Sequence, residues 1–193
     1  MRQPELRERL LRAAEAEIAE AGPARASLRA IARRCGVSHQ ATAHHFEDRA
    51  GLFTALALEG FDVLCARTRA AVGDAEPAGG AQVVAAAAAY VEFALLHPAM
   101  FDVMFRPEIV RAGDPRLGRA RAEHRSLLVA VLEEAQRAGW GVAAPTEELA
   151  TLGWAAVHGL AVLERDQLIS DLHPDVDLEA ILLRVVQALD VIA

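Results

Sequence analysis

The sequence predicts an all-α protein with two helical domains. Alanine occupies 42 of the 193 positions and all 20 basic residues are arginine, a composition that favours helices. Only 5% of the residues are aromatic, too few for the core of a β-sandwich or β-barrel. Every segment with a clear hydrophobic pattern has the helical period. No apolar run approaches the roughly 20 residues of a membrane span.

Four helices are expected in the first part of the chain. Apolar residues recur at i, i+3 and i+4 from Leu6 to Ile18, and Gly22 with Pro23 ends this first helix. Ser27 and Ser38 stand where helix N-caps are expected. The next three helices are predicted over 28–34, 39–46 and about 48–73.

Five more helices are expected after a linker over residues 73–80, which gives about nine in all. Asp114 followed by Pro115 is typical of an N-cap with proline at the first helical position. Glu147 and Glu148 favour a helix start because acidic side chains stabilise the first turn. The predicted ranges are 81–96, 99–105, 115–139, about 146–170, and about 176 to the C-terminus.

Charge is unevenly distributed along the chain. The formal net charge is −7, yet residues 1–50 hold nine arginines against seven acidic residues. Within 25–49 there are five arginines, two acidic residues and three histidines. A small basic patch on an acidic body can bind phosphates locally while the bulk charge limits non-specific binding. Two cysteines are too few for a disulfide framework, so a cytoplasmic location is expected.

Residues 27–52 (SLRAIARRCGVSHQATAHHFEDRAGL) have the pattern of a helix-turn-helix, two short helices joined by a turn with glycine. Gly36 can adopt the positive φ that such a turn needs. Ile31 and Val37 are placed to pack the two helices together. The exposed face of the second helix is expected to enter the major groove of DNA. It presents His39, Gln40, Ala41 and His44.

The segment IARRCGVSHQATAHHFEDRAGLFTAL resembles the DNA-binding signature of the TetR family of bacterial repressors. The matching residues are Ile31, Ala32, Gly36, Val37, Ser38, Phe46, Arg49 and Leu52. The resemblance implies phosphate contacts from Ser27 and Ser38, and a base-edge contact from Arg29. It also implies base or groove contacts from His39, Gln40, Ala41 and His44, and backbone contacts from His45 and Arg49. Ala43 departs from the family pattern, which usually has tyrosine there.

The second half is similar to a TetR subgroup with a Trp-x-x-x-His-Gly pattern, here Trp154, His158 and Gly159, with His97 and Pro98 upstream. The resemblance implies a ligand domain and a homodimer whose last two helices from each subunit form a four-helix interface. The candidate pocket residues are Phe93, His97, Phe101, Met104, Phe105, Trp154 and His158. The alternative for these side chains is an ordinary core, and His158 is then a core histidine.

The dimer is also predicted from the residues themselves. The final helix is apolar around most of its circumference, so it needs cover on all sides, and a second subunit is the simplest cover. Glycines in the preceding helix permit close helix contacts. The candidate interface residues are Gly153, Gly159, Ile181, Leu182, Val185 and Leu189.

Other site chemistries have weaker support. His39, His44 and His45 do not share one helix face, and no Cys/His cluster has zinc spacing, so no metal is expected. Cys35 could be a redox-sensitive thiol near Arg33 and Arg34, but a buried apolar filler is the favoured interpretation. No nucleophile, phosphate-loop or dinucleotide motif indicates an enzyme.

The predicted function is therefore a DNA-binding transcriptional regulator, a repressor released by a small-molecule effector. Residues 1–50 form the DNA-binding domain, the helix over about 48–73 connects, and residues 51–193 bind ligand and dimerise. The expected partners are double-stranded DNA with a palindromic operator, an unidentified effector and a second copy of the chain, with no membrane and no cofactor. The alternative is a helical small-molecule-binding protein that has lost specific DNA binding, which Ala43 supports. An enzyme on a helical bundle is the third possibility.

Overall fold

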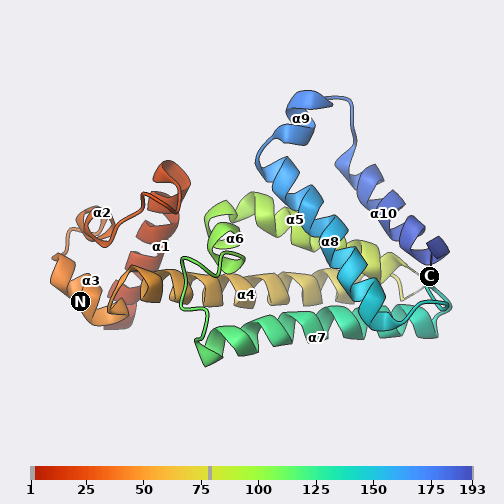
Figure 1. Cartoon of the computed structure of the whole chain (residues 1–193), viewed down its shortest axis with the longest axis horizontal. Helices are drawn as coiled ribbons and strands as arrows, with labels where there is room; N and C mark the ends of the chain where they lie inside the picture. Colours follow the sequence, from red (N-terminus) through yellow and green to blue (C-terminus); the bar gives the residue numbers. More distant parts are fainter. Residues whose placement is uncertain (1–2, 78–79, 193) are drawn as a thin grey trace. The chain divides into compact units, whose positions relative to one another are not determined.

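The computed structural model describes residues 3–77 and 80–192, and in these ranges it contains ten helices and no strand (Figure 1). The helices are α1 (Gln3–Ala21), α2 (Leu28–Arg34), α3 (His39–Phe46), α4 (Arg49–Asp74), α5 (Ala81–Leu96), α6 (Pro98–Met104), α7 (Pro115–Arg137), α8 (Thr146–Arg165), α9 (Leu168–Leu172) and α10 (Leu178–Ile192). The all-α prediction is confirmed. The expected linker over 73–80 overlaps the end of α4, which reaches Asp74, so the connection to α5 covers 75–80, with residues 78 and 79 outside the described ranges.

One helix more is present than the sequence pattern predicts. The helix expected to reach about residue 170 ends at Arg165, and the short α9 follows it. The break occurs where Gln167 takes a left-handed backbone conformation, with φ of 59°. Glycine is the usual residue for this conformation, so a glutamine gives no signal in the sequence.

The chain forms two compact units, each with its own core. The first comprises Met1–Asp62 and His97–Arg121, and the second Val63–Leu96 and Ala122–Ala193. Helices α4 and α7 therefore contribute residues to both units. In the first unit α1 packs against α2 and α6, α2 packs against α3, and the apolar face of α1 is buried.

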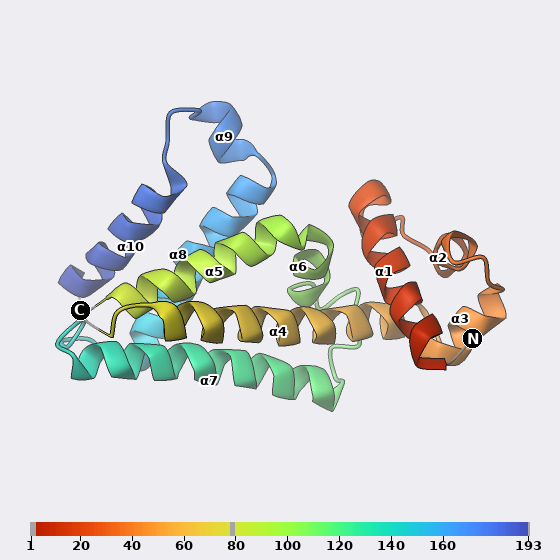
Figure 2. The ribbon, with the colours of Figure 1, turned by 180° about the vertical axis from the view of Figure 1, so that it is seen from behind.

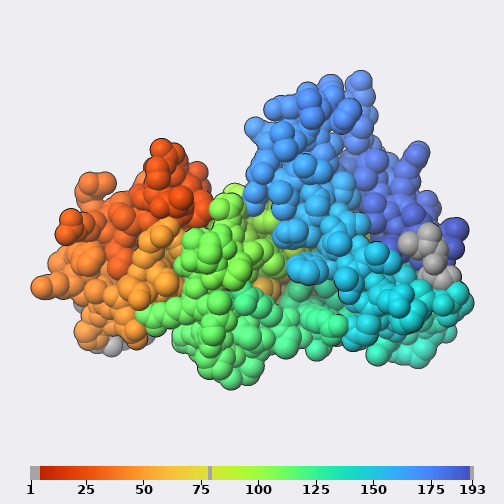
Figure 3. All heavy atoms as spheres, viewed as in Figure 1, coloured from red at the N-terminus to blue at the C-terminus, as the bar shows by residue number. Residues whose placement is uncertain are grey.

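In the second unit, α5 and α8 pack along each other and α10 contacts both. The cluster at their centre includes Val83, Val131, Trp140, Leu149 and Val186. Figures 1 and 2 show α8 leading to α9, and α10 returning beside α8. The short α9 and the turn after it stand out from this unit in the space-filling view (Figure 3).

None of the described helices is by itself both long enough and apolar enough to cross a membrane. The consecutive pair α5 and α6 meets the length and composition criteria only when its two members are taken together.

Candidate functional site

Helices α2 and α3 form the predicted helix-turn-helix, and local signals account for its geometry. The Ser27 Oγ accepts a hydrogen bond from the Ala30 N–H at 3.2 Å, and the Ser38 Oγ accepts one from the Ala41 N–H at the same distance. Gly36, between the two helices, has φ of 66°. Both predicted caps and the predicted glycine turn are confirmed. The hydroxyl oxygens satisfy N–H groups that the first turn of a helix leaves without a partner.

The outward face of α3 carries the residues that were predicted to read DNA. Ser38, His39, Gln40 and His44 are exposed, and Ala41 and His45 are half-buried. Thr42 and Phe46, on the opposite face, are buried. Ser27 and Arg29 of the α2 start are exposed as well. The structure thus brings eight of the nine predicted DNA-contacting residues to accessible positions on α2 and α3, and their contacts with DNA stay predictions.

Arg49, the ninth, is used within the chain. Its guanidinium donates a hydrogen bond to the Pro23 carbonyl oxygen and lies 4.7 Å from the centre of the Phe53 ring. These contacts tie the start of α4 to the loop between α1 and α2. A phosphate contact from Arg49 stays a prediction, and it would share the guanidinium with these two partners.

Charged contacts hold α1 against the end of α2. The Arg34 guanidinium donates to Glu17 at 2.6 Å and also to Glu20, and these hydrogen bonds raise the pKa of Arg34. The Arg9 guanidinium donates to the Cys35 carbonyl oxygen at 2.9 Å. Burial raises the pKa of the Cys35 thiol, and its Sγ lies 3.4 Å from the Arg9 carbonyl oxygen. Cys35 therefore lacks the lowered pKa of a reactive thiol.

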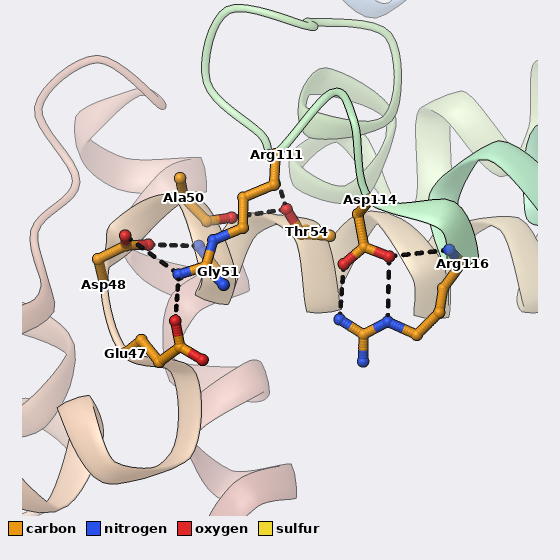
Figure 4. Close-up of polar contacts among 8 residues, drawn as sticks. All are labelled: Glu47, Asp48, Ala50, Gly51, Thr54, Arg111, Asp114 and Arg116. Carbon is orange, nitrogen blue, oxygen red and sulfur yellow. Dashed lines mark hydrogen bonds and ion pairs between the residues drawn. The ribbon is translucent and has the colours of Figure 1, made fainter.

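A second set of contacts surrounds the junction of α3 and α4 (Figure 4). The Arg111 guanidinium donates to Glu47 at 2.9 Å and pairs with Asp48 at 3.1 Å. The Arg111 main-chain N–H donates to the Thr54 Oγ1 at 2.9 Å. Arg111 lies in the connection between α6 and α7. Its side chain and its main chain both fix this connection to the junction of α3 and α4. Sequence reasoning missed this contact because its partners lie 57 to 64 positions away.

The junction itself is capped by Asp48. Its carboxylate accepts a hydrogen bond from the Gly51 N–H at 2.7 Å, and this bond, with Arg111, lowers the pKa of Asp48. Asp48 therefore acts as the N-cap of α4. Glu47, just before it, has φ of 64° although it is not a glycine. In the same view, Asp114 caps α7 through the Arg116 N–H at 2.8 Å, and its pKa is lowered to about 2 (Figure 4).

The second unit contains an apolar cavity of about 60 Å³ between α5, α7, α8 and α10. Of the lining residues, Tyr90 and Trp154 have polar atoms in their side chains, while the remaining side chains are aliphatic or absent, as in Gly153. The Tyr90 hydroxyl is 2.8 Å from the His158 Nδ1 and 3.3 Å from the Trp154 Nε1, which donates to it. The predicted pair Trp154 and His158 therefore meets at one hydroxyl.

Of the seven predicted pocket residues, only Trp154 lines this cavity, and His158 is linked to it through the Tyr90 hydroxyl. Phe93 is completely buried in the second unit. Phe101 and Phe105 are in the first unit, with ring centres 5.2 Å apart, and Met104 approaches Gly60 there. His97, in the same unit, is 3.4 Å from Glu15. These side chains gather in the sequence because α6 is a short core helix, which was the alternative considered for them.

Sequence reasoning missed Tyr90. It is the only tyrosine of the chain, and it sits in an alanine-rich helix at a position that is 3% exposed. A lone hydroxyl-bearing aromatic residue on an otherwise apolar helix face was the available signal, because a buried tyrosine usually finds a hydrogen-bond partner.

The candidate interface residues divide into two groups. Leu182 and Leu189 are buried within their own subunit, and Gly153 lies close to Leu189. Gly159, Ile181 and Val185 are half-buried. The large apolar side chains that remain exposed on α8 and α10 are Leu152, Trp154, Leu163, Leu183 and Val191. Participation of any of them in a dimer stays a prediction.

Among the described residues, no group of three or more His, Cys, Asp or Glu side chains is placed to hold a metal ion.

Comparisons with known proteins identify two family regions. Residues 10–56 match "Bacterial regulatory proteins, tetR family", and residues 83–189 match "Tetracyclin repressor-like, C-terminal domain". The first match contains α2 and α3, and the second contains the cavity. No protein with a curated description matches the chain.

Several solved structures have the same fold. A protein of unknown function from Rhodococcus sp. RHA1 is 32% identical, with 95% of this chain and 93% of that one covered and a TM-score of 0.80. The fatty acid degradation regulator FadR from Bacillus halodurans is 16% identical, with 98% and 96% covered and a TM-score of 0.76. The ketosteroid transcriptional regulator KstR2 of Mycobacterium tuberculosis is 22% identical, with 95% and 92% covered and a TM-score of 0.66. At these identities the last two show the fold alone.

Proposed function

The chain belongs to the TetR family of bacterial regulatory proteins, and from this premise we propose that it is a homodimeric repressor in which α3 of each subunit reads one half of a palindromic operator. The observation that carries this proposal is the outward face of α3. Its side chains are exposed beside two capped helix starts, while the opposite face is buried. This is the arrangement that a recognition helix needs.

Each residue of this face has a proposed role. Gln40 makes bidentate hydrogen bonds to an adenine, and Ala41 contacts a thymine methyl. His39 and His44 contact the groove, and Arg29 reaches a base edge from α2. Ser27, Ser38, His45 and Arg49 position the unit through phosphates, for which the first N–H groups of α2 and α3 are suitable donors. Residues 1–50 form this DNA-binding domain, with α4 as the connection.

In this proposal, residues 51–193 mediate dimerisation. Helices α8 and α10 of two subunits form a four-helix interface that covers exposed apolar side chains such as Leu152 and Leu183. A two-fold dimer places two copies of α3 on half-sites about 34–36 Å apart, one turn of the double helix.

A small-molecule effector bound in the second unit releases the operator. The match of Trp154, His158 and Gly159 to the TetR subgroup pattern supports this location, as does the cavity beside Trp154. An effector can shift the dimer to a non-binding state only by binding that state more tightly. Operator DNA and effector must therefore weaken each other's binding by the same factor.

The test is selection of binding sites from random duplex DNA at near-physiological salt, followed by titration of the enriched sequence. We expect an inverted repeat. Gln40→Ala should cost about 1–3 kcal/mol and relax specificity at one position of each half-site. Arg29→Ala should weaken binding, while Arg119→Ala, which removes an arginine that is also exposed, from α7, should not. Weak binding without sequence preference, abolished by added salt, would refute the repressor proposal.

A second candidate function is ligand binding without specific DNA recognition. Ala43 favours it, because this half-buried position of α3 lacks the tyrosine that is usual in the family. Restoring the aromatic side chain with Ala43→Tyr separates the two candidates. If the substitution creates operator binding that the natural chain lacks, the second candidate is correct.

A further inference from the structure

The cavity of the second unit is almost entirely hydrocarbon. Its walls come from α5, α7, α8 and α10, and include Val83, Ala87, Leu128, Leu149 and Val186. No lining side chain among the described residues carries a charge. An ionised group has a high cost of transfer from water into such surroundings unless it is paired. A ligand that occupies this cavity therefore presents hydrocarbon to most of it.

One end of the cavity offers a hydrogen-bonding group without charge. The Tyr90 hydroxyl is held between the His158 Nδ1 and the Trp154 Nε1. Burial raises the pKa of Tyr90. Burial and the positive charge of Arg165 lower the pKa of His158, so both side chains are neutral near pH 7, and Arg165 itself pairs with Asp166 at 2.8 Å. The His124 ring lies 6.0 Å from the Tyr90 ring, and burial lowers its pKa to about 4. These groups can bond an uncharged oxygen but supply no counter-charge for a carboxylate, phosphate or ammonium.

The small size of the cavity limits which ligands fit without a rearrangement. At about 60 Å³ it is far smaller than the roughly 300–1,000 Å³ of typical ligand sites. Trp154 lines it and is 44% exposed, so the indole forms a part of the wall that also meets solvent. A ligand larger than a few heavy atoms needs more room than this, and displacement of the indole provides it. The displacement breaks the hydrogen bond from Trp154 to Tyr90, and the ligand takes the place of the indole beside the hydroxyl, which keeps His158 as its other partner.

We propose that this cavity takes an uncharged, mainly apolar molecule with a single hydroxyl or carbonyl oxygen, which replaces the Trp154 indole as the partner of the Tyr90 hydroxyl. The assignment of this molecule as the effector rests on the proposed repressor function. The aliphatic walls provide most of the affinity, and the Tyr90 hydroxyl selects an oxygen over plain hydrocarbon.

The binding test uses three probes with the same chain and different head groups: 1-octanol, octanoate and octyltrimethylammonium, all below the concentrations at which they aggregate. Binding to the full-length protein is followed by tryptophan fluorescence in a Trp140→Phe background, where Trp154 is the remaining tryptophan. We expect saturable binding of 1-octanol with a red-shifted emission. The two charged probes should bind at least ten-fold more weakly. Equal or tighter binding of either charged probe would overturn the proposal.

Two matched variants on α5 test the location. Ala87 lines the cavity, and Ala87→Leu should fill it and reduce 1-octanol affinity at least ten-fold. Ala88 is its exposed neighbour, and Ala88→Leu should have no effect. Thermal unfolding and dimer mass are measured for both, because added methylenes can strain a core. If affinity is unchanged in a folded Ala87→Leu protein, the cavity is not the site.

Tyr90→Phe tests the head-group contact. It should weaken 1-octanol binding about three- to ten-fold, the usual net value of one hydrogen bond, and leave n-butylbenzene binding unchanged. Equal losses for both probes would refute the role of the hydroxyl.

Operator binding in the presence of 1-octanol separates this proposal from the repressor function. If the chain binds no operator but still binds 1-octanol as described, the repressor proposal fails and the ligand class stands. If the chain binds an operator and no neutral probe binds, the ligand class fails alone.

Discussion

At the scale of single residues, the junction of the helix-turn-helix with α4 needs close main-chain contacts that a larger side chain would prevent. Gly51 is at the tightest of them. A Cβ at this position would lie 2.0 Å from the Phe46 carbonyl oxygen, well inside contact distance. Because the obstructing atom belongs to the main chain at the end of α3, no rotation of a side chain can relieve the clash. The missing Cβ thus lets α4 begin directly after α3.

Gly51→Ala should therefore destabilise the junction of α3 and α4. We expect a loss of about 2 kcal/mol or more in the free energy of unfolding, measured by urea denaturation. Gly118→Ala is the matched control, since a Cβ there meets nothing within 4 Å and alanine favours the helix. A Gly51→Ala protein as stable as the Gly118→Ala protein would show that the junction can move apart without cost.

Single residues also show which local features can be predicted from the sequence. The caps at Ser27 and Ser38 and the turn at Gly36 could be predicted, because each acts on N–H groups or dihedral angles within three residues of itself. The constraint on Gly51 could not, since it depends on how α4 leaves α3. The positive φ angles of Glu47 and Gln167 could not be predicted either, because neither residue type favours them.

At the scale of elements, the connection between α6 and α7 supports the end of α3. Arg111 contacts Glu47 and Asp48 through its guanidinium and Thr54 through its main chain. Periodicity located every helix of this unit, but it carries no information on which loop reaches which helix end. The pocket residues predicted in α6 show the same limit, because a cluster of aromatic residues along the chain looks alike in a core and in a pocket.

Arg111→Ala should loosen this support without unfolding the unit. The ion pairs are largely exposed and screened by solvent, so the loss of overall stability should be small. Hydrogen exchange should nevertheless become faster for the last turn of α3 and the first turn of α4. Arg106→Ala is the control, because it removes a guanidinium that pairs with Asp102 four residues earlier. It should leave the exchange rates of these amides unchanged. Unchanged exchange in the Arg111→Ala protein would contradict the supporting role.

Buried histidines make the second unit sensitive to mild acid. Burial lowers the pKa of His124 to about 4 in the folded protein, against about 6.5 for the unfolded chain. Between these values the unfolded state binds more protons, so stability is lost as pH falls from about 6.5 to about 4. Burial lowers the pKa of His158 too, and this acts in the same direction.

His124→Gln should flatten this pH dependence. At pH 7 the variant is expected to be no more stable than the natural chain. The natural chain should lose up to about 3 kcal/mol more than the variant between pH 6.5 and pH 4, measured by denaturation at each pH. Parallel pH profiles for the two proteins would show that His124 is protonated without penalty in the fold. Asp114, with a pKa of about 2, titrates below this window and does not interfere.

At the scale of the whole molecule, one subunit leaves much apolar surface of its last helices uncovered. The sequence predicts that the final helix is buried on several sides, and α10 indeed contributes Leu182, Val186 and Leu189 to its own core. Packing against α5 and α8 determines which faces of α10 remain available for a partner. The hydrophobic pattern of the sequence alone could not distinguish these faces. Leu183 and Val191 remain exposed, so the surface available for a second subunit differs from the predicted set.

Leu183→Glu should therefore abolish the dimer and specific operator binding together. A carboxylate at a side chain that is 45% exposed costs one subunit little, but it meets its own symmetry mate or an apolar surface when two subunits associate. Sedimentation should give a folded monomer, and operator affinity should fall at least 100-fold, because one recognition helix contacts only one half-site. Leu96→Glu, at a side chain that is 57% exposed at the end of α5, should remain a dimer and bind normally. If the Leu183→Glu protein stays dimeric, the interface lies elsewhere; if it is monomeric and still binds the full operator tightly, two subunits are not needed to read it.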